Sequence, residues 1–177
     1  MKVIGVNGHT GSGKSTVCRV FERLGAYYID ADSVVHALYE KGNAGARKIE
    51  IFFGEEFLKS DGSVNRNKLR KVILGDSRKL KILNNLIHPL VAHEVEKLLK
   101  KCAKDICVIE AISFDKKHLG RLIDKLIWVD RILDKKNERI SNLQEKPEKV
   151  DFVLDNNCSK TELKEKSKKL WRKIMSL

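Results

Sequence analysis

Gly8-His9-Thr10-Gly11-Ser12-Gly13-Lys14-Ser15 is the stretch of this chain that decides its fold. It reads G-x-x-x-x-G-K-S, follows the apolar run Val3–Val6 and precedes the run Thr16–Phe21. A strand, a glycine-rich turn and a helix start, in that order, form the context that a phosphate-binding loop (P-loop) requires. Glycines let the backbone curl so that its N–H groups point at phosphate oxygens, and the helix N-terminus adds a partial positive charge. We therefore expect a nucleotide-binding loop here rather than a flexible Gly/Ser loop.

Two side chains at the end of this loop carry the expected chemistry. Lys14 would reach the β- and γ-phosphates of the nucleotide, and the hydroxyl of Ser15 would coordinate Mg²⁺. The residues of this region that we expect to contact ATP are Gly8, His9, Thr10, Gly11, Ser12, Gly13, Lys14, Ser15 and Thr16.

Composition indicates an ordinary globular protein. The chain has 177 residues, of which 42% are hydrophobic and 34% charged, so we expect one domain with a helical insertion. No apolar run approaches the roughly 20 residues that span a bilayer. The start runs directly into a strand, which leaves no room for a cleavable signal peptide. Four cysteines without metal-ligand spacing are expected to be reduced thiols, so we predict a cytoplasmic protein without membrane contact.

The net charge of +12 does not by itself indicate nucleic-acid binding. The lysines are spread at spacings typical of solvated helix faces, without an aromatic platform for single strands or a known DNA- or RNA-binding signature. A basic cleft also suits a protein that holds two polyanionic ligands at once. The sequence therefore argues against nucleic acid as the partner.

Apolar runs and helical patterns alternate along the chain, which predicts an α/β fold around an open, mostly parallel sheet. We expect strands at 3–6, 27–29, 106–109, 126–129 and 152–154. Beside the helix after the P-loop, we expect helices at about 33–40, 44–53, 65–74 and 76–103, the last broken or bent at His88-Pro89, and a closing helix capped by Thr161. Ligands of such sheets bind beyond the carboxyl ends of the strands.

Five blocks of this sequence resemble the dephospho-CoA kinase family over essentially the whole chain. They are Ile4–Thr16 with the P-loop; Leu24-Gly25 with Ile29-Asp30-Ala31-Asp32; Phe53-Gly54, Asp61-Gly62 and Asn65-Arg66 through Leu69; Leu86-Ile87-His88-Pro89-Leu90; and Phe152–Asn157. A P-loop alone would indicate only a nucleoside triphosphate binder, whereas the Asp-Ala-Asp and His-Pro blocks make the match specific.

The resemblance implies a three-layer α/β/α P-loop NTPase fold with a five-stranded parallel sheet. The core would comprise about 1–32 and 104–177, a helical substrate subdomain about 33–103, and a short lid about 130–145. It also implies transfer of the γ-phosphoryl group of ATP to the ribose 3′-hydroxyl of dephospho-CoA, with Mg²⁺. The partners would be ATP and dephospho-CoA, and the protein a monomer or weak homo-oligomer.

The resemblance further implies roles for single residues, each with a structural alternative. Asp32 would accept or orient the hydroxyl proton, or else cap the following helix. His88 would lie in the acceptor pocket, or else cap a helix or pack in the core. Arg139 would reach the phosphates from the lid, or else form surface ion pairs. Asn156 and Asn157 would lie in the loop near the adenine, or else only form a turn.

The chain also departs from the family pattern. The segment Glu110–Asp115 replaces the usual end of the third strand, and the lid segment is shorter than usual. The roles of Glu110 and Asp115 therefore stay open here. Two other functions are compatible with the motifs: a kinase for another nucleotide or nucleoside, and a nucleotide-dependent switch that has lost transfer.

Overall fold

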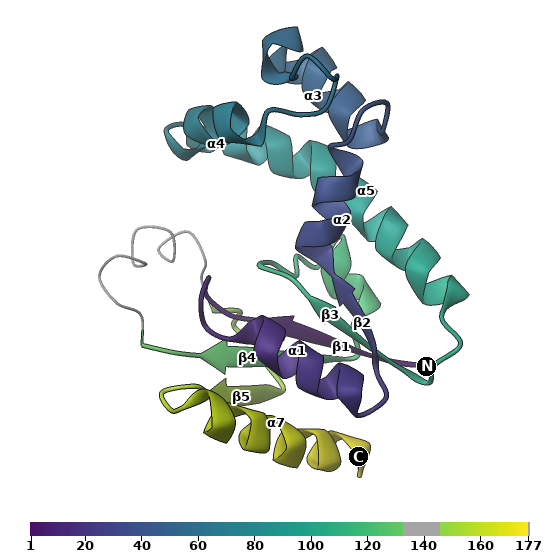
Figure 1. Ribbon diagram of the computed structural model, residues 1–177, viewed down its shortest axis with the longest axis vertical. Helices are drawn as coiled ribbons and strands as arrows, with labels where there is room; N and C mark the ends of the chain where they lie inside the picture. The colour runs from purple at the N-terminus through teal and green to yellow at the C-terminus, as the bar shows by residue number, and fades with distance from the viewer. Residues whose placement is uncertain (133–145, 177) are drawn as a thin grey trace. The chain divides into compact units, whose positions relative to one another are not determined.

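The computed structural model describes residues 1–132 and 146–176 and divides into two compact units. Unit 1 consists of Met1–Asp30 and Lys101–Leu177, and unit 2 of Ala31–Lys100 (Figure 1). In the described ranges, no helix combines the length and the apolar character needed to cross a membrane.

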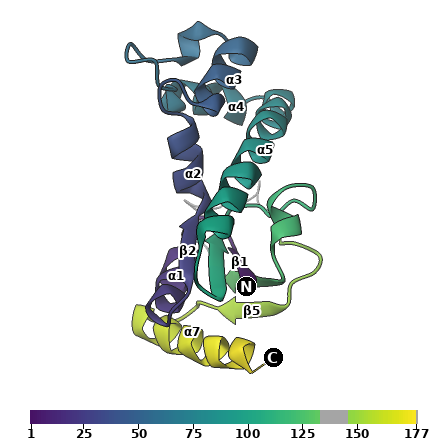
Figure 2. The same ribbon diagram turned by 90° about the vertical axis from the view of Figure 1, so that its right-hand side faces the viewer.

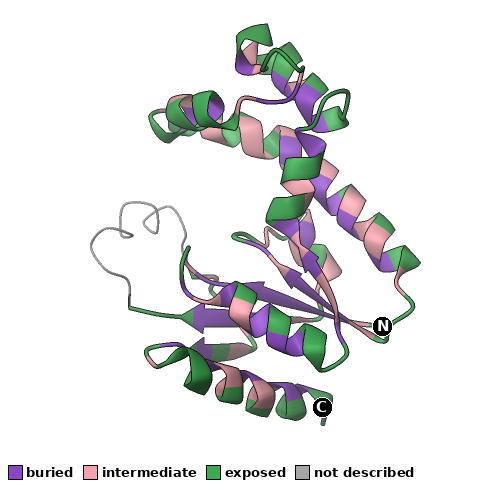
Figure 3. Ribbon diagram, viewed as in Figure 1, coloured by how far each residue is buried: buried purple, intermediate pink, exposed green. Residues whose placement is uncertain are grey.

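Unit 1 is built on a sheet of five parallel strands in the order β2-β3-β1-β4-β5. The strands are β1 (Lys2–Asn7), β2 (Tyr27–Asp30), β3 (Ile106–Glu110), β4 (Lys125–Asp130) and β5 (Phe152–Asp155). Much of β1, β3 and β4 is buried (Figure 3), which suits the continuous apolar runs that form them. The predicted five-stranded parallel sheet and the α/β class are confirmed.

Two helices of unit 1 cover one face of this sheet. They are α1 (Lys14–Arg23) and α7 (Lys160–Met175), and α7 lies beside β5 in both views (Figures 1 and 2). Their apolar side chains form one buried cluster with the strands, in which the Phe21 and Trp171 rings lie 5.1 Å apart. Trp128 is buried on β4, so both tryptophans are core residues, as the sequence indicated.

The loop between β3 and β4 approaches the sheet at Gly5. A Cβ added to Gly5 would lie 3.0 Å from side-chain atoms of both Phe114 and Ile123. The loop also contains the short 3₁₀ helix η2 (Leu119–Leu122). Glycine at position 5 therefore lets this loop pack closely on β1.

Unit 2 is helical. It contains α2 (Ala31–Leu38), α3 (Ala44–Phe53), the 3₁₀ helix η1 (Glu55–Phe57), α4 (Arg66–Leu74) and α5 (Ser77–Lys101) except for its last residue. Asn65 caps α4 as the sequence predicted, because its Oδ1 accepts a hydrogen bond from the backbone N–H of Lys68 at 3.1 Å.

Two expectations about helix boundaries were wrong. The helix is not interrupted at His88-Pro89, one of the two alternatives expected there: α5 is one continuous helix with Pro89 inside it. Burial of Ile87, Val91 and Val95 on this helix offsets the single backbone hydrogen bond that proline removes.

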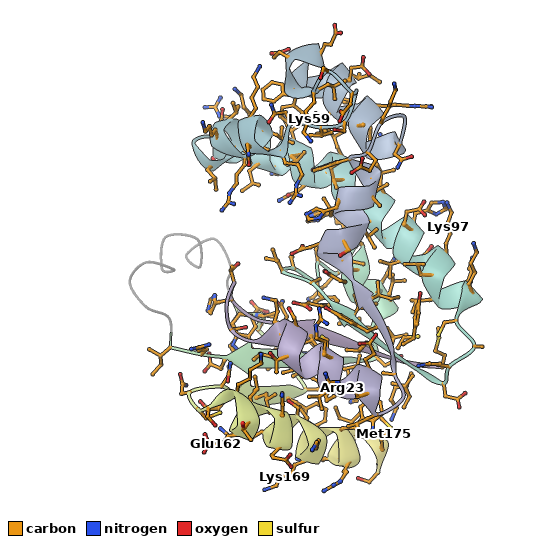
Figure 4. The ribbon with its side chains drawn as sticks, in the orientation of Figure 1. Arg23, Lys59, Lys97, Glu162, Lys169 and Met175 are labelled. Carbon is orange, nitrogen blue, oxygen red and sulfur yellow. The ribbon has the colours of Figure 1, made fainter. Side chains whose placement is uncertain are left out.

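The other correction concerns the start of α7. Its cap is Ser159 rather than Thr161: the Ser159 side chain accepts from the Glu162 N–H, and the Glu162 carboxylate accepts from the Ser159 N–H. Figure 4 labels Glu162 on α7. This reciprocal capping box satisfies two N–H groups, whereas Thr161 lies within the first turn of the helix.

Candidate active site

The P-loop joins β1 to α1 and depends on glycine at two closely packed positions. A Cβ on Gly8 would lie 2.5 Å from the Val129 carbonyl oxygen, and a Cβ on Gly13 would lie 2.5 Å from Asn156 Nδ2. Gly13 also has a φ of 100°, in the left-handed region that disfavours side chains. The motif glycines are therefore required by the packing of this loop as well as by its turn.

Lys14 lies inside the curve of the loop. Its side chain is buried, and Nζ donates hydrogen bonds to the carbonyl oxygens of Gly8 and His9, both at 2.9 Å. The loop thus holds a cation against its own backbone, at the position where the motif predicts contact with phosphates.

The helix after the loop begins without a side-chain cap, because its N-cap residue is Gly13. N–H groups in the first turn of a helix lack intrahelical partners and attract anions. Nearby, the Ser12 hydroxyl is fully buried and, among the described residues, has no hydrogen-bond partner. Since an unpaired buried hydroxyl is costly, this loop fits an anionic ligand that supplies an acceptor.

A carboxylate from β3 meets the P-loop serine. Ser15 Oγ donates a hydrogen bond to Glu110 Oε1 at 2.8 Å, and the Tyr28 hydroxyl donates to Glu110 Oε2. Partial burial, together with the hydrogen bond to Glu110 and its charge, raises the pKa of Tyr28 well above its ordinary value. Tyr28 therefore keeps its proton and acts as a fixed donor to this carboxylate.

This arrangement determines which way the Ser15 hydroxyl faces. Its proton points at Glu110, which leaves the oxygen lone pairs for a cation. A hydroxyl and a carboxylate are hard oxygen donors, the type that Mg²⁺ prefers. In the described part of the chain, no group of three His, Cys, Asp or Glu side chains could hold a metal ion. Mg²⁺ keeps several waters in its sites and is bound largely through substrate phosphates.

Asn156 holds the P-loop in shape, a role that the sequence analysis did not predict for it. Its side chain is buried, and Nδ2 donates to the Ser12 carbonyl at 2.6 Å. The neighbouring Asn157 is exposed, and its Oδ1 accepts from the Ile132 N–H at 2.7 Å. Asn156 thus ties the turn after β5 to the P-loop, while contact between Asn157 and ATP stays a prediction.

For the remaining predicted residues, the structure assigns no position relative to the P-loop. Asp32 and His88 belong to unit 2, and Arg139 lies outside the described residues. Asp32 is exposed and is the second residue of α2, so it lies inside the first turn rather than at the N-cap. His88 is half-buried within α5. Their catalytic and acceptor-binding roles stay predictions.

Asp115, whose role was open, has a structural function. Its Oδ1 accepts hydrogen bonds from the N–H groups of Lys117 and His118, both at 3.0 Å, so it shapes the loop after β3. This loop borders a cavity of about 430 Å³ that includes Lys125 and Asp151. Because these residues lie at the amino ends of β4 and β5, the cavity is at the opposite end of the sheet from the P-loop.

Comparisons with known proteins agree with this geometry. The family model of dephospho-CoA kinase matches residues 2–167. A dephospho-CoA kinase from Aquifex aeolicus is 30% identical, with 98% of each chain covered. Among solved structures, a Thermus thermophilus protein gives a TM-score of 0.73 at 22% identity, covering 96% of this chain and 95% of its own. A dephospho-CoA kinase from Campylobacter jejuni gives 0.64 at 23% identity, covering 98% and 97%.

The two structural matches lie below 25% identity and support the fold alone, whereas the family model and the Aquifex relative extend over nearly the whole chain. The resemblance predicted from the motifs is therefore confirmed. This chain belongs to the dephospho-CoA kinase family.

Proposed function

We propose that this protein transfers the γ-phosphoryl group of ATP to the ribose 3′-hydroxyl of dephospho-CoA, giving CoA and ADP, the final step of CoA biosynthesis. The observation that supports this most directly is the P-loop with Lys14 buried inside it, in a chain of this family. Phosphoryl transfer needs little covalent help from the protein, so positioning and charge neutralisation supply most of the catalysis.

In this proposal Lys14 binds the transferring group. Its ammonium would exchange the Gly8 and His9 carbonyls, each 2.9 Å away, for oxygens of the β- and γ-phosphates. The N–H groups at the start of α1 would bind the same phosphates. Asn156 would keep the loop in shape through its bond to the Ser12 carbonyl.

Mg²⁺ would be held by Ser15, with Glu110 as a positioning residue. The bound ion would neutralise charge that develops on the phosphate oxygens. Glu110 would keep the Ser15 hydroxyl proton away from the cation, and Tyr28 would keep Glu110 in place. This role for Glu110 follows from its contact with Ser15 and not from the family motif, from which the chain departs at this strand end.

The acceptor side of the reaction rests on residues whose roles are still predictions. Asp32 would accept or orient the proton of the ribose hydroxyl, and His88 would bind the acceptor. Arg139 would cover the phosphates and exclude water during transfer.

A substrate panel tests the proposed function. Purified full-length protein is incubated with ATP and Mg²⁺, alone or with dephospho-CoA, AMP or adenosine, and ADP formation is followed in a coupled assay. We expect ADP to form at a substantial rate only with dephospho-CoA, and mass spectrometry to identify CoA as the product. ADP formation with AMP or adenosine alone would instead indicate a nucleotide or nucleoside kinase. Binding of ATP without transfer to any acceptor would indicate a switch.

A further inference from the structure

Two cysteines of unit 1 lie beside each other, away from the P-loop. The Cys107 thiol donates a hydrogen bond to Cys102 Sγ, and the two sulfurs are 3.4 Å apart. Cys107 is on β3, while Cys102 lies directly after α5 in the connection to that strand. Both are free thiols in the structure. The sequence predicted reduced thiols but gave no sign that these two are neighbours.

The distance between the sulfurs is short enough for a disulfide to form with small adjustments. A disulfide has an S–S length near 2.05 Å, so the sulfurs must approach by about 1.4 Å. Cys107 is held in the sheet between Val3 of β1 and Tyr27 of β2. Cys102 lies outside regular secondary structure, where its sulfur accepts from the Lys104 N–H at 3.4 Å. The required movement can therefore come from Cys102.

The two thiols differ in their access to solvent. Cys107 is fully buried, and burial, followed by the hydrogen bond and charge of Cys102, raises the pKa of Cys107 to about 12. Cys102 is only half-buried. An oxidant in solution therefore meets Cys102 first, with Cys107 behind it as the second thiol.

The other two cysteines lack this arrangement. Cys18 is fully buried in the core under α1, and burial raises its pKa well above the ordinary value. Cys158 is half-buried like Cys102, but its thiol contacts an oxygen, Asn156 Oδ1, at 3.9 Å. Cys158 thus provides a matched control, a partly exposed cysteine placed against an oxygen acceptor.

We propose that Cys102 and Cys107 form a redox-active dithiol, a modification site for small disulfides such as oxidised glutathione. The Cys102 thiolate attacks one sulfur of oxidised glutathione, breaks its S–S bond and releases one glutathione thiolate. Cys107 then loses its proton to solvent and attacks Cys102 Sγ, which forms the protein disulfide and releases the second glutathione thiolate. Two protein thiols are oxidised and one glutathione disulfide is reduced to two thiols.

The neighbouring thiol also changes what peroxide would do to Cys102. A sulfenic acid condenses with a nearby thiol to a disulfide, a reversible state, instead of proceeding to irreversible sulfinic acid. The bond would tie the start of β3 to the turn after α5. Because the two residues are only five positions apart, the ring is small and its effect on stability is modest. The proposal does not depend on the proposed kinase activity.

The test uses the full-length wild-type protein, reduced, freed of reductant and then incubated with oxidised glutathione. After quenching with acid, free thiols are counted under denaturing conditions. We expect the count to fall from four to two, with a mass loss of about 2 Da for two hydrogens. Non-reducing tryptic digestion should join peptide 102–104 to peptide 105–116.

Three variants test the order of the two steps, after circular dichroism has shown that each reduced variant is folded. Cys107→Ser should trap one glutathione on Cys102, because the second thiol is missing. Cys102→Ser should resist oxidation at Cys107. Cys158→Ser, the control, should still form the disulfide and retain one free thiol.

Three results would overturn the proposal. The wild type could keep all four thiols, it could retain glutathione on Cys102 without forming the disulfide, or its bridge could join a different pair of cysteines. The wild-type peptide map decides among these outcomes even if a variant fails to fold.

Discussion

Lys14 is the residue on which the proposed transfer depends most directly. Lys14→Ala should lower kcat/KM by about 10²-fold or more, because a preorganised donor to the transferring group is lost. The coupled assay measures this, and circular dichroism checks that the variant is folded. Arg19→Ala removes an exposed positive charge from the same helix and should leave turnover near the wild-type value. Near-normal turnover in folded Lys14→Ala would remove Lys14 from the mechanism.

Glu110 acts through Ser15 and not on the nucleotide itself. Glu110→Gln keeps the shape of the side chain but removes its charge, so Ser15 is oriented less well toward the cation. We expect the Mg²⁺ concentration for half-maximal activity to rise by about 10-fold or more, as for other residues that position metal ligands. ATP binding measured in EDTA should not change.

Two further variants accompany Glu110→Gln. Tyr28→Phe, which removes only the donor to Glu110, should shift the Mg²⁺ requirement in the same direction by a smaller factor. Glu165→Gln, on the exposed face of α7, is the control and should leave the Mg²⁺ requirement unchanged. An unchanged Mg²⁺ requirement in Glu110→Gln would show that its contact with Ser15 is only structural.

Asp32 is predicted to act on the acceptor and not on ATP. Asp32→Asn should lower kcat by roughly 10²–10⁴-fold, the usual range for general-base assistance. The affinity for ATP should stay close to the wild-type value, because the P-loop holds the nucleotide. Steady-state kinetics and ATP titration separate these effects. If Asp32→Asn lowered the affinity for ATP strongly and left kcat unchanged, Asp32 would instead be a ligand of the nucleotide or its metal.

Among the elements, α7 offers a direct test of helix capping. Ser159→Ala removes the acceptor of the Glu162 N–H and should lower the free energy of unfolding by about 1 kcal/mol. Thr161→Ala, two positions further along the same helix, should lower the free energy of unfolding much less. Urea unfolding of the two variants side by side measures the difference. Equal losses would mean that Ser159 is not the dominant cap.

For the whole molecule, the described carboxyl groups predict loss of stability in acid. Hydrogen bonds from Ser63, Lys166, Ser159 and Lys168 lower the pKa values of Asp61, Asp155, Glu162 and Glu165, respectively. A carboxyl group with a lowered pKa stabilises the folded state above its unfolded pKa of about 4. This contribution is lost as the pH falls through the lower folded value.

Asp151 belongs to the same set. Partial burial acts to raise its pKa, but hydrogen bonds from the Leu126 N–H at 2.8 Å and from Lys125 at 2.9 Å outweigh burial and lower it. We therefore expect the Tm to fall as the pH is lowered from about 5 to about 3. Asp151→Asn should have a lower Tm at neutral pH and a smaller fall over this interval. Parallel Tm profiles for the two proteins would exclude Asp151 as a contributor.

The sequence by itself determined the parts of this protein that depend on residues close together in the chain. The P-loop follows from the spacing of its glycines and Lys14 between a strand and a helix, and the cap at Asn65 needs only the N–H of Lys68. Some local patterns allowed two interpretations. Ser159 and Thr161 were both possible caps of α7, and Ser159 is the cap. Pro89 favoured a break in α5, but the helix continues because burial of its apolar face outweighs one lost hydrogen bond.

Only the tertiary structure decided which distant residues meet the P-loop. Glu110 reaches Ser15 across 95 positions of chain, and Asn156 reaches Ser12 across 144. Both contacts depend on the strand order, which places β3 on one side of β1 and β4, with β5 beyond it, on the other. Local patterns predict that a segment is a strand, but they carry no information about which strand lies beside it. That choice is made by the packing of all the strands and helices together, because each must bury its apolar face against another.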